Sequence, residues 1–460
     1  MRMRRREFLT LAGRSDPVLG EDEARRIAAD VLATSTADEA SVALSASLRS
    51  NTRYAVNRIT TAGETADLSA AVTARFGRRE ATLTVNELDR ESLRDAVRRA
   101  EEMARLAPED PESMPLLGPQ EYEPSAGWHD STAALDADRR AAVAAGAIER
   151  AGSAEGDLTV AGFLDVRRGA RALANSAGLF AYHPATSASY SLTARTADGT
   201  GSGWAGVGQR DWSAVDADTL HAAAIERALR SRRPQPLEPG TYPVILGPQA
   251  VADLVTLLVW SLDARAADEG RSAFAAPGGN RLGELVVDER VTLRSDPIAA
   301  GDAPFASDGL PERPVAWIED GVLRNLVYTR FWGRAKGRRP TGRPATFRME
   351  GGEGSVADLI ARTERAVLVT RLWYIRSVDP RTILYTGLTR DGTFWVEDGE
   401  ISHPVNNFRW NDSPLQLLRH LEALGRPVRV TGAGSDGGSL REVPPLRASR
   451  FTFSSVSEAV

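Results

Sequence analysis

The chain has 460 residues, of which 42% are hydrophobic and 26% are charged, a balance typical of a globular protein. Its formal net charge of −5 argues against a general binder of polyanions, because such domains usually carry a basic excess. Cysteine is absent, which excludes disulfides, zinc–thiolate sites, iron–sulfur clusters and a cysteine nucleophile. A chain of this length usually divides into two domains.

Residues 1–20 are expected to form an N-terminal tail. Within it, Arg5-Arg6-Glu7-Phe8-Leu9 resembles a twin-arginine export signal, but the apolar segment that must follow is missing. No stretch reaches the roughly 18 uncharged apolar residues of a membrane span, and Asp253 and Asp263 bracket the best candidate. We therefore expect a cytoplasmic protein that does not contact the membrane.

Residues 21–232 are predicted to form an N-terminal α+β domain containing an antiparallel meander. Alternating runs separated by Asn, Gly and Glu predict short strands, and Asn175-Ser176-Ala177-Gly178 predicts a hairpin turn further along. The proline-rich segment 107–127 is expected to cross the surface as a connector. The strand runs cover residues 40–50, 52–60, 66–77 and 79–86, and the expected helices cover 21–33, 89–106, 133–151 and 215–231.

The proline-rich segment 232–240 marks the domain boundary, and residues 240–460 are predicted to form a second, β-rich domain. A helix is expected over 250–274 and another over 413–424, among many antiparallel strands. The dipeptides Asp320-Gly321, Asp391-Gly392 and Asp398-Gly399 predict hairpin turns, because glycine tolerates positive φ. The fold class is therefore α+β, with a curved sheet or barrel-like C-terminal domain and few helices.

Familiar motifs of cofactor binding and catalysis carry little weight in this sequence. Residues 201–206 match the dinucleotide-binding pattern GxGxxG, but a strand precedes them and no helix opens after them, which favours a glycine-rich strand edge. The histidines lack the spacing of a metal motif, and no GxSxG or SxxK sequence supports a serine nucleophile. The five histidines are His129, His183, His221, His403 and His420.

A basic segment, residues 330–348, carries seven Arg or Lys residues among aromatic ones. It could be a solvated loop, a grip for a peptide or its carboxylate, or a contact for nucleic acid. For a peptide, the candidate residues are Arg338, Thr341, Gly342 and Arg343. Nucleic-acid binding would depend on Arg338, Arg339 and Arg343, and the acidic overall charge makes it the least favoured reading.

An ordered series of segments resembles the TldD/PmbA family, the "modulator of DNA gyrase" proteins also described as microcin-processing peptidases. The resemblance covers nearly the whole chain. It includes "NTRYAVNRITTAGE", "ARLAPEDPESMPLLGP", "VILGPQAVADLV", "DEGRSAF", "LGELVVDERVTLRSDP", "PVAWIEDGVLRNLVYTRFWGRAKGRRPTG" and "FTFSSVSEAV".

The resemblance implies a zinc site on the helix after "VILGP", with the motif HExxxH and a cysteine near the C-terminus. Counted back from Gly270, the first histidine falls on Val255, the glutamate on Thr256 and the second histidine on Trp260. The cysteine position falls near Ala433. None of these side chains can ligate zinc, so we expect no catalytic residues, no metal and no cofactor in this chain.

The resemblance then implies a TldE-like, metal-free subunit that pairs with a zinc-bearing TldD-type paralogue and holds an unfolded peptide substrate. An exposed strand could hold that peptide by β-augmentation. A stand-alone hydrolase with a relocated site is one alternative, and it would use Asp263, Asp268, Glu269 or His403. A nucleic-acid or topoisomerase-binding modulator is the other. The sequence does not separate a heterodimer from a homodimer.

Overall fold

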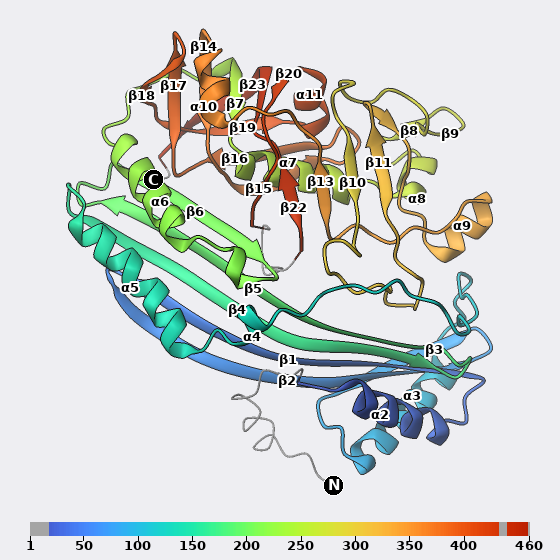
Figure 1. Cartoon of the computed structure of the whole chain (residues 1–460). Coiled ribbons are helices and arrows are strands. Elements are labelled where there is room, and N and C mark those ends of the chain that lie inside the picture. Colours follow the sequence, from blue (N-terminus) through green and yellow to red (C-terminus); the bar gives the residue numbers. More distant parts are fainter. Residues whose placement is uncertain (1–17, 432–438, 459–460) are drawn as a thin grey trace.

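A computed structural model describes residues 18–431 and 439–458 of the chain. The N-terminal part is built on one six-stranded antiparallel sheet with the order β3-β2-β1-β4-β5-β6. This sheet passes beneath the whole C-terminal part (Figure 1). Its strands are β1 (Glu39–Ala55), β2 (Arg58–Phe76), β3 (Arg79–Val85), β4 (Leu158–Asn175), β5 (Phe180–Thr196) and β6 (Ser202–Gln209).

The strands of this sheet are much longer than the sequence predicted. The runs 40–50 and 52–60 were expected to be separate strands, but β1 continues through residue 55 and turns only at Val56 and Asn57. Both turn residues have positive φ, of 51° and 54°, and the Asn57 side chain bonds to Leu158 O and Val160 N. Asn tolerates this backbone conformation, and its contacts with β4 hold the turn in place.

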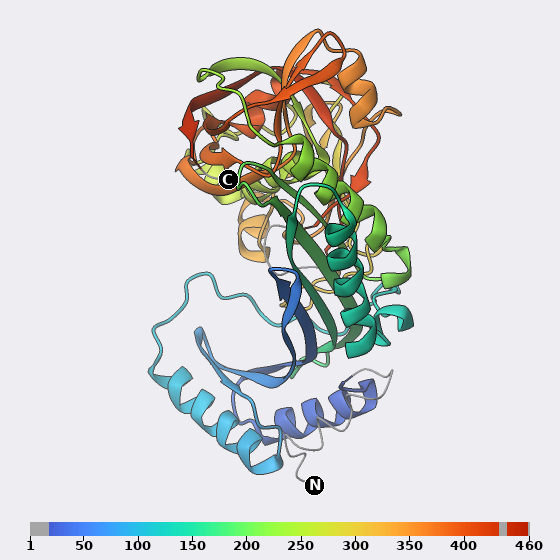
Figure 2. The same ribbon diagram turned by 90° about the vertical axis from the view of Figure 1, so that its left-hand side faces the viewer.

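Four helices cover one face of the sheet, and the other face looks toward the C-terminal part (Figures 1 and 2). The even-numbered residues of β1, β4 and β5 pack against these helices in two hydrophobic clusters. Successive strand residues point to opposite faces, so the odd-numbered residues line the other side. The helices are α2 (Glu21–Thr34), α3 (Arg90–Leu106), α5 (Ala137–Ser153) and α6 (Ala217–Arg230), with the short α4 (Asp130–Ala133) and η2 (Trp212–Ala214) beside them.

The C-terminal part contains open sheets. A nine-stranded sheet has the order β15-β16-β19-β23-β7-β14-β17-β18, with β20 beside β23, and a six-stranded sheet has the order β12-β11-β10-β13-β22-β21. The α+β fold class is confirmed, but the strands that the structure describes form no closed barrel. β15 and β18 remain free edges of the larger sheet.

The strands of the C-terminal part are β7 (Gly240–Leu246), β8 (Ala275–Ala276), β9 (Gly279–Asn280), β10 (Leu293–Ser295), β11 (Val315–Glu319), β12 (Val322–Leu323), β13 (Phe347–Met349), β14 (Arg365–Val369), β15 (Leu372–Asp379), β16 (Leu384–Thr389), β17 (Thr393–Glu397), β18 (Glu400–Pro404), β19 (Asn407–Asp412), β20 (Leu421–Leu424), β21 (Val428–Arg429), β22 (Arg441–Val443) and β23 (Leu446–Ser457). Its helices are α7 (Pro248–Trp260), α8 (Ala264–Asp268), α9 (Arg330–Lys336), α10 (Val356–Ala361) and α11 (Pro414–Arg419).

Two helices expected in the C-terminal part are shorter than predicted. The helix over 250–274 ends at Trp260, because Asp263 caps a separate helix, α8, by accepting from Ala266 N at 2.8 Å. The helix over 413–424 ends at Arg419, and the chain continues as β20 beside β23. The last residues of that segment therefore form a strand, because their pairing with β23 outweighs their tendency to continue the helix.

The predicted turns are present, with one difference. Asp320-Gly321 joins the paired strands β11 and β12, and Asp398-Gly399 joins the paired strands β17 and β18. Asp391-Gly392 also has positive φ at both residues, but it joins β16 to β17, which do not pair. It is a turn between non-adjacent strands, and it was wrongly predicted to close a hairpin.

Helix α7 forms the centre of the C-terminal part. Ten consecutive residues, Ala250 to Val259, are buried, so the helix is surrounded by protein on nearly all sides. Its neighbours include β7, β15, β22 and α11. The uninterrupted apolar run in the sequence reflects this central position.

Candidate functional site

The helix positions singled out in the sequence have different surroundings. Val255 is 2% exposed and packs in the main hydrophobic cluster, and Thr256 is buried with its Oγ1 donating to Ala252 O at 2.7 Å. Trp260, the last residue of α7, is 52% exposed. Ala433 lies outside the described residues.

A zinc ion does not fit the α7 positions. Val255 offers no donor atom, Thr256 uses its hydroxyl within the helix, and an indole does not ligate zinc. Across the described residues, no group of three or more His, Cys, Asp or Glu side chains could hold a metal ion. We therefore derive no chemistry through a metal in this chain.

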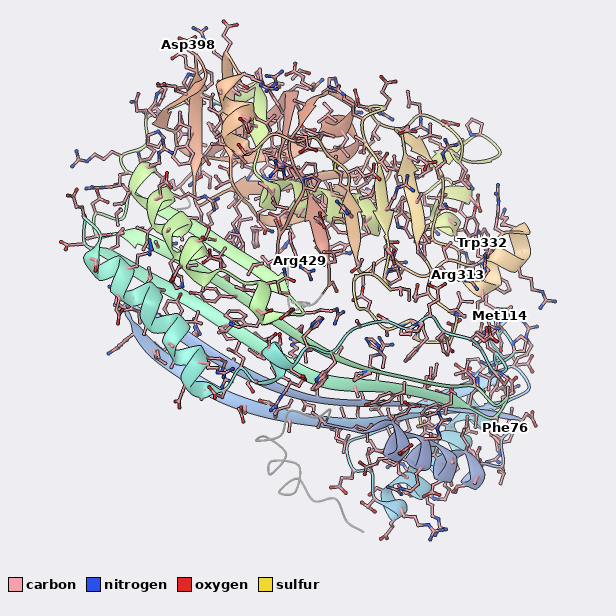
Figure 3. All side chains as sticks on the ribbon, in the orientation of Figure 1. Phe76, Met114, Arg313, Trp332, Asp398 and Arg429 are labelled. Atoms are coloured by element: carbon pink, nitrogen blue, oxygen red, sulfur yellow. The ribbon has the colours of Figure 1, made fainter. Side chains whose placement is uncertain are left out.

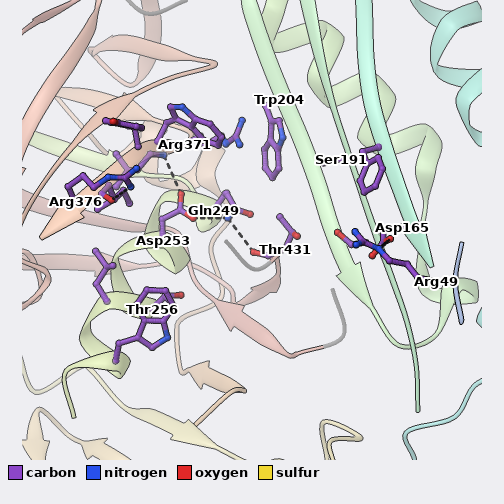
Figure 4. A pocket seen from close by; sticks show the side chains of 18 residues that line it. Arg49, Asp165, Ser191, Trp204, Gln249, Asp253, Thr256, Arg371, Arg376 and Thr431 are labelled. Carbon is purple, nitrogen blue, oxygen red and sulfur yellow. Dashed lines mark hydrogen bonds and ion pairs between the residues drawn. The ribbon is translucent and has the colours of Figure 1, made fainter. Parts of the chain in front are cut away.

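One face of α7 nevertheless borders a cavity of about 720 Å³ between the two parts of the molecule. Figure 4 shows this cavity with residues of α7 and β15 on one side and of the N-terminal sheet on the other. The α7 residues are spaced three or four apart, as expected for a single helical face. They are Gln249, Asp253, Thr256 and Trp260, and Leu257 beside Thr256 also lines the cavity.

Asp253 is a carboxylate at the wall of this cavity. It accepts hydrogen bonds from Gln249 Nε2 at 2.9 Å and from Leu372 N at 3.3 Å. Burial raises its pKa to about 6, although the Gln249 bond and the charge of Arg371 act in the opposite direction. In the sequence, Asp253 was notable only because it interrupts an apolar run and so argues against a membrane span. The signal in the sequence that could have identified this site was a single acid within an apolar run, four residues after Gln249.

Arg371 connects the two parts of the molecule at the same cavity. Its Nη1 lies 2.7 Å from Oδ2 of Asp391, a buried carboxylate that also accepts from Ser202 of β6 at 2.6 Å. The guanidinium carbon lies 4.3 Å from the ring centre of Trp204 and 4.8 Å from that of Trp373. Arg371 is therefore held between an aromatic residue from each part and paired with a buried acid.

The carboxylates of the relocated-site hypothesis have structural partners. Asp263 caps α8, and Asp268 accepts from Asn280 Nδ2 at 2.6 Å and from Trp332 Nε1 at 2.8 Å. Glu269 is paired with Arg265 and Arg271. His403 comes from β18, at the opposite end of the C-terminal part from α8 (Figure 1). These contacts are helix capping for Asp263, buried hydrogen bonds for Asp268 and exposed ion pairs for Glu269, and the four side chains do not meet at one centre.

The basic segment is partly ordered by its own contacts. It contains α9, which carries Trp332 (labelled in Figure 3). Arg265 and Lys336 lie over the Trp332 ring, each 5.0 Å from its centre. Arg338 is exposed. Thr341 Oγ1 is used inside the fold, donating to Leu326 O and accepting from Tyr328 N, both at 3.0 Å.

Two of the peptide-binding candidates, Gly342 and Arg343, line a second cavity of about 460 Å³. The carboxylate of Glu312 approaches Gly342 so closely that a Cβ there would lie 2.1 Å from Oε2. Burial, followed by the charges of Asp302 and Asp308, raises the pKa of Glu312 to about 7. The structure thus brings Gly342 and Arg343 to a cavity and leaves Arg338 and Thr341 outside its lining.

Two family models of metallopeptidase domains match this chain. The PmbA/TldA metallopeptidase central domain matches residues 125–232, and the corresponding C-terminal domain matches residues 239–455. The chain belongs to the PmbA/TldD metallopeptidase family.

Solved structures show the same fold. TldE from Thermococcus kodakarensis superposes with a TM-score of 0.83 at 19% identity, covering 94% of this chain and 99% of that one. A protein from Bacteroides thetaiotaomicron described as a modulator of DNA gyrase gives the same TM-score and identity, with 95% and 99% covered.

Curated relatives match over shorter regions. A metalloprotease of Methanothermobacter thermautotrophicus is 24% identical over 50% of this chain and 52% of its own length. Metalloprotease PmbA of Escherichia coli O157:H7 is 24% identical over 45% of this chain and 46% of its own. The chain therefore spans about half the length of these relatives. Among the described helices, none is both long and apolar enough to cross a bilayer.

Proposed function

We propose that this protein is the metal-free, TldE-like subunit of a two-subunit peptidase that cleaves or trims unfolded peptides. A TldD-type paralogue would contribute the zinc and the catalytic base. This chain would contribute part of the chamber and a surface for the peptide. The observation that carries the proposal is the state of α7, where the ligand positions hold Val255, Thr256 and Trp260 while the helix still borders a large cavity.

Features of the cavity support a peptide as the ligand. β15 is an edge strand, and five consecutive residues, Leu372 to Arg376, line the cavity. An edge strand can pair with an extended peptide through backbone hydrogen bonds, and neighbouring aromatic residues can pack on its side chains. Trp260, Trp373 and Tyr374 are exposed at this place. We keep Arg338, Thr341, Gly342 and Arg343 as candidates for a second contact with the peptide.

The test is to purify this chain, a TldD-type paralogue encoded beside it, and the co-expressed pair. Zinc content and hydrolysis of an unstructured peptide are measured for all three. We expect zinc in the paralogue and the pair, and activity that depends on the pair. A paralogue variant with both motif histidines changed to alanine is the matched control, and it should abolish activity while leaving the pair assembled.

Two results would contradict the proposal. One is stoichiometric zinc on this chain alone. The other is peptide hydrolysis by this chain alone that is lost in Asp263→Asn or Asp268→Asn, because that result would favour the stand-alone hydrolase.

A further inference from the structure

The face of the N-terminal sheet that looks toward the C-terminal part has an unusual composition. The register places Arg167 opposite Arg49 on one side and opposite Ser187 on the other, and it places Arg171 opposite Ser45 and His183. We call this face of β1, β4 and β5 the floor. Its side chains are mostly small and polar, and arginine side chains project from it toward the C-terminal part. This contrasts with the net charge of −5 of the whole chain.

Two adjoining cavities lie over this floor, with volumes of about 460 and 360 Å³. They share Arg171, His183, Ala185, Arg210 and Ser439. The smaller cavity has no carboxylate in its lining, and the larger one has only Asp302 and Glu312. Both cavities are thus rich in positive charge.

Most of the arginines here are already engaged. Arg167 pairs with Asp165 at 3.1 Å, Arg210 pairs with Asp302 and donates to Ala300 O at 2.8 Å, and Arg343 lies 3.5 Å from Asp263. The side chain of Arg168 is on the helix side of the sheet and donates to Ala133 O. These contacts leave little capacity for a ligand.

Arg171 and Arg313 differ from these residues. Neither forms a hydrogen bond or an ion pair with any residue that the structure describes, and both line the larger cavity. Arg171 rises from β4 with its guanidinium 5.6 Å from the ring centre of Phe305. Arg313 belongs to the C-terminal part and is labelled in Figure 3. The charge of Arg171 acts on Glu312 in the same cavity, but no hydrogen bond joins the two side chains. Two guanidinium groups without a hydrogen-bonded partner among the described residues, one from each part, therefore border the same space.

Neutral donors accompany the two arginines. The hydroxyls of Ser45, Ser47 and Ser187 line the smaller cavity and bond to no side chain or backbone atom among the described residues. His183 donates through Nε2 to Gly301 O at 3.2 Å, and burial lowers its pKa to about 4, so at neutral pH it adds no charge. The free donors are suited to an oxyanion with two oxygens, because a guanidinium binds carboxylate in a bidentate manner.

The floor also connects these cavities with the one beside α7. Along β4, Asp165 lines the α7 cavity, Arg167 the smaller arginine cavity, and Arg171 both arginine cavities. The six-residue step from Asp165 to Arg171 spans roughly 20 Å at the rise of a β-strand. An extended peptide of about six residues would reach from one to the other.

We infer that Arg171 and Arg313 form a carboxylate-binding subsite, which holds an acidic group of an extended peptide whose remaining residues run along β4 toward α7. The acidic group is either the C-terminal carboxylate or an Asp or Glu side chain. The inference rests on the proposed function for the peptide itself, but it concerns binding by this chain and requires neither zinc nor hydrolysis.

The test is the binding of fluorescein-labelled ten-residue Ala/Ser peptides to the purified full-length chain, measured by anisotropy. The peptides end in a free carboxylate, in an amide, in an amide with one internal Glu, or in an amide with one internal Lys. We expect at least one acidic peptide to bind about 10-fold or more tightly than the neutral amide. Whether the free terminus or the internal Glu gives the gain identifies the acidic group.

Arg171→Ala and Arg313→Ala should each remove most of this preference, whereas Arg339→Ala, an exposed arginine outside both cavities, should leave it intact. Because Arg171 forms no hydrogen bond or ion pair with a described residue and lies 5.6 Å from the Phe305 ring centre, its variant should keep a melting temperature close to that of the wild type. Arg171→Lys should restore part of the affinity, because lysine keeps the positive charge. It should not restore all of it, because an ammonium group cannot form the bidentate hydrogen bonds of a guanidinium.

Equal binding of acidic and neutral peptides by the wild-type chain would overturn the inference, and so would a preference for the Lys peptide. Competition by inorganic phosphate without any discrimination among the peptides would indicate a small-anion site and would also overturn it. If the preference depends on Arg171 but the pair shows no peptidase activity, the proposed function fails and the subsite stands. If the pair is active but this chain shows no preference for acidic peptides, the subsite fails and the proposed function stands.

Discussion

At the scale of the residue, Asp253 is the most informative side chain of α7. It is buried beside the α7 cavity, and its carboxylate is held by Gln249 and the backbone of Leu372. Burial raises its pKa from 3.8 to about 6, so the folded protein binds a proton that the unfolded chain releases. The stability that this proton contributes is present below pH 4 and is lost as pH rises through 6.

Asp253→Asn should remove this pH dependence. The amide can accept from Leu372 N and donate to Gln249 Oε1 after the Gln249 amide rotates, so the fold should be retained. We expect the variant to gain stability over the wild type between pH 4 and 7, by up to about 3 kcal/mol for a shift of two pKa units. Urea unfolding at several pH values measures this. A difference in unfolding free energy between variant and wild type that stays constant across this pH range would contradict the proposed link between Asp253 protonation and stability.

At the scale of the element, the GxGxxG match is explained by packing. Residues 202–209 form the edge strand β6, and helix α6 lies directly against it. A Cβ on Gly203 would lie 2.1 Å from Ala224 O and 2.5 Å from Ala228 N. The glycines therefore allow a helix to approach a strand closely, and the expectation of a glycine-rich strand edge is confirmed.

Gly203→Ala should destabilise the protein by about 3 kcal/mol or more, because the backbone of α6 cannot move away without losing its contacts with β5 and β6. Gly63→Ala is the matched control. Gly63 also lies in a strand, its Cβ would meet nothing within 4 Å, and the change should stay within about 1 kcal/mol. Thermal unfolding compares the two. Similar melting temperatures for both variants would show that α6 adjusts freely.

At the scale of the whole molecule, one cluster joins the two parts beside the α7 cavity. Ser202 and Trp204 come from β6, while Arg371, Trp373 and Asp391 come from the C-terminal part. Asp391 is buried, so removing its main cation would leave a charge without adequate compensation. The cluster therefore fixes how the α7 face meets the sheet.

Arg371→Ala should lower the free energy of unfolding by about 3 kcal/mol, the lower end for a broken buried pair, since Ser202 still contacts Asp391. Arg376→Ala is the control, because Arg376 is exposed and its side chain, among the described residues, donates to Ile375 O and lies over the ring of Tyr374 without an ion pair. It should cost less than about 1 kcal/mol. Hydrogen exchange should also rise in β6 of the Arg371 variant. Unchanged exchange there would mean that the cluster does not hold the two parts together.

The sequence by itself determined the local features of this protein. Alternation and capping residues located most strands and helices, and Gly next to Asp identified turns with positive φ. These properties depend on residues close together in the chain. The expectation that positions 255, 256 and 260 lack zinc ligands came from the family resemblance and stays a prediction. The prediction from sequence failed where distant segments compete, as in residues 421–424, which join a sheet instead of continuing a helix.

Only the tertiary structure decided which side chains share a cavity. Strand alternation divides the residues of β4 into two faces, but the cross-strand register decides that Arg171 faces the C-terminal part beside Ser45. The packing of α7 then decides that Thr256 and Trp260 border a cavity while Val255 fills the core. Such assignments depend on contacts between residues far apart in the chain, and no local pattern contains them.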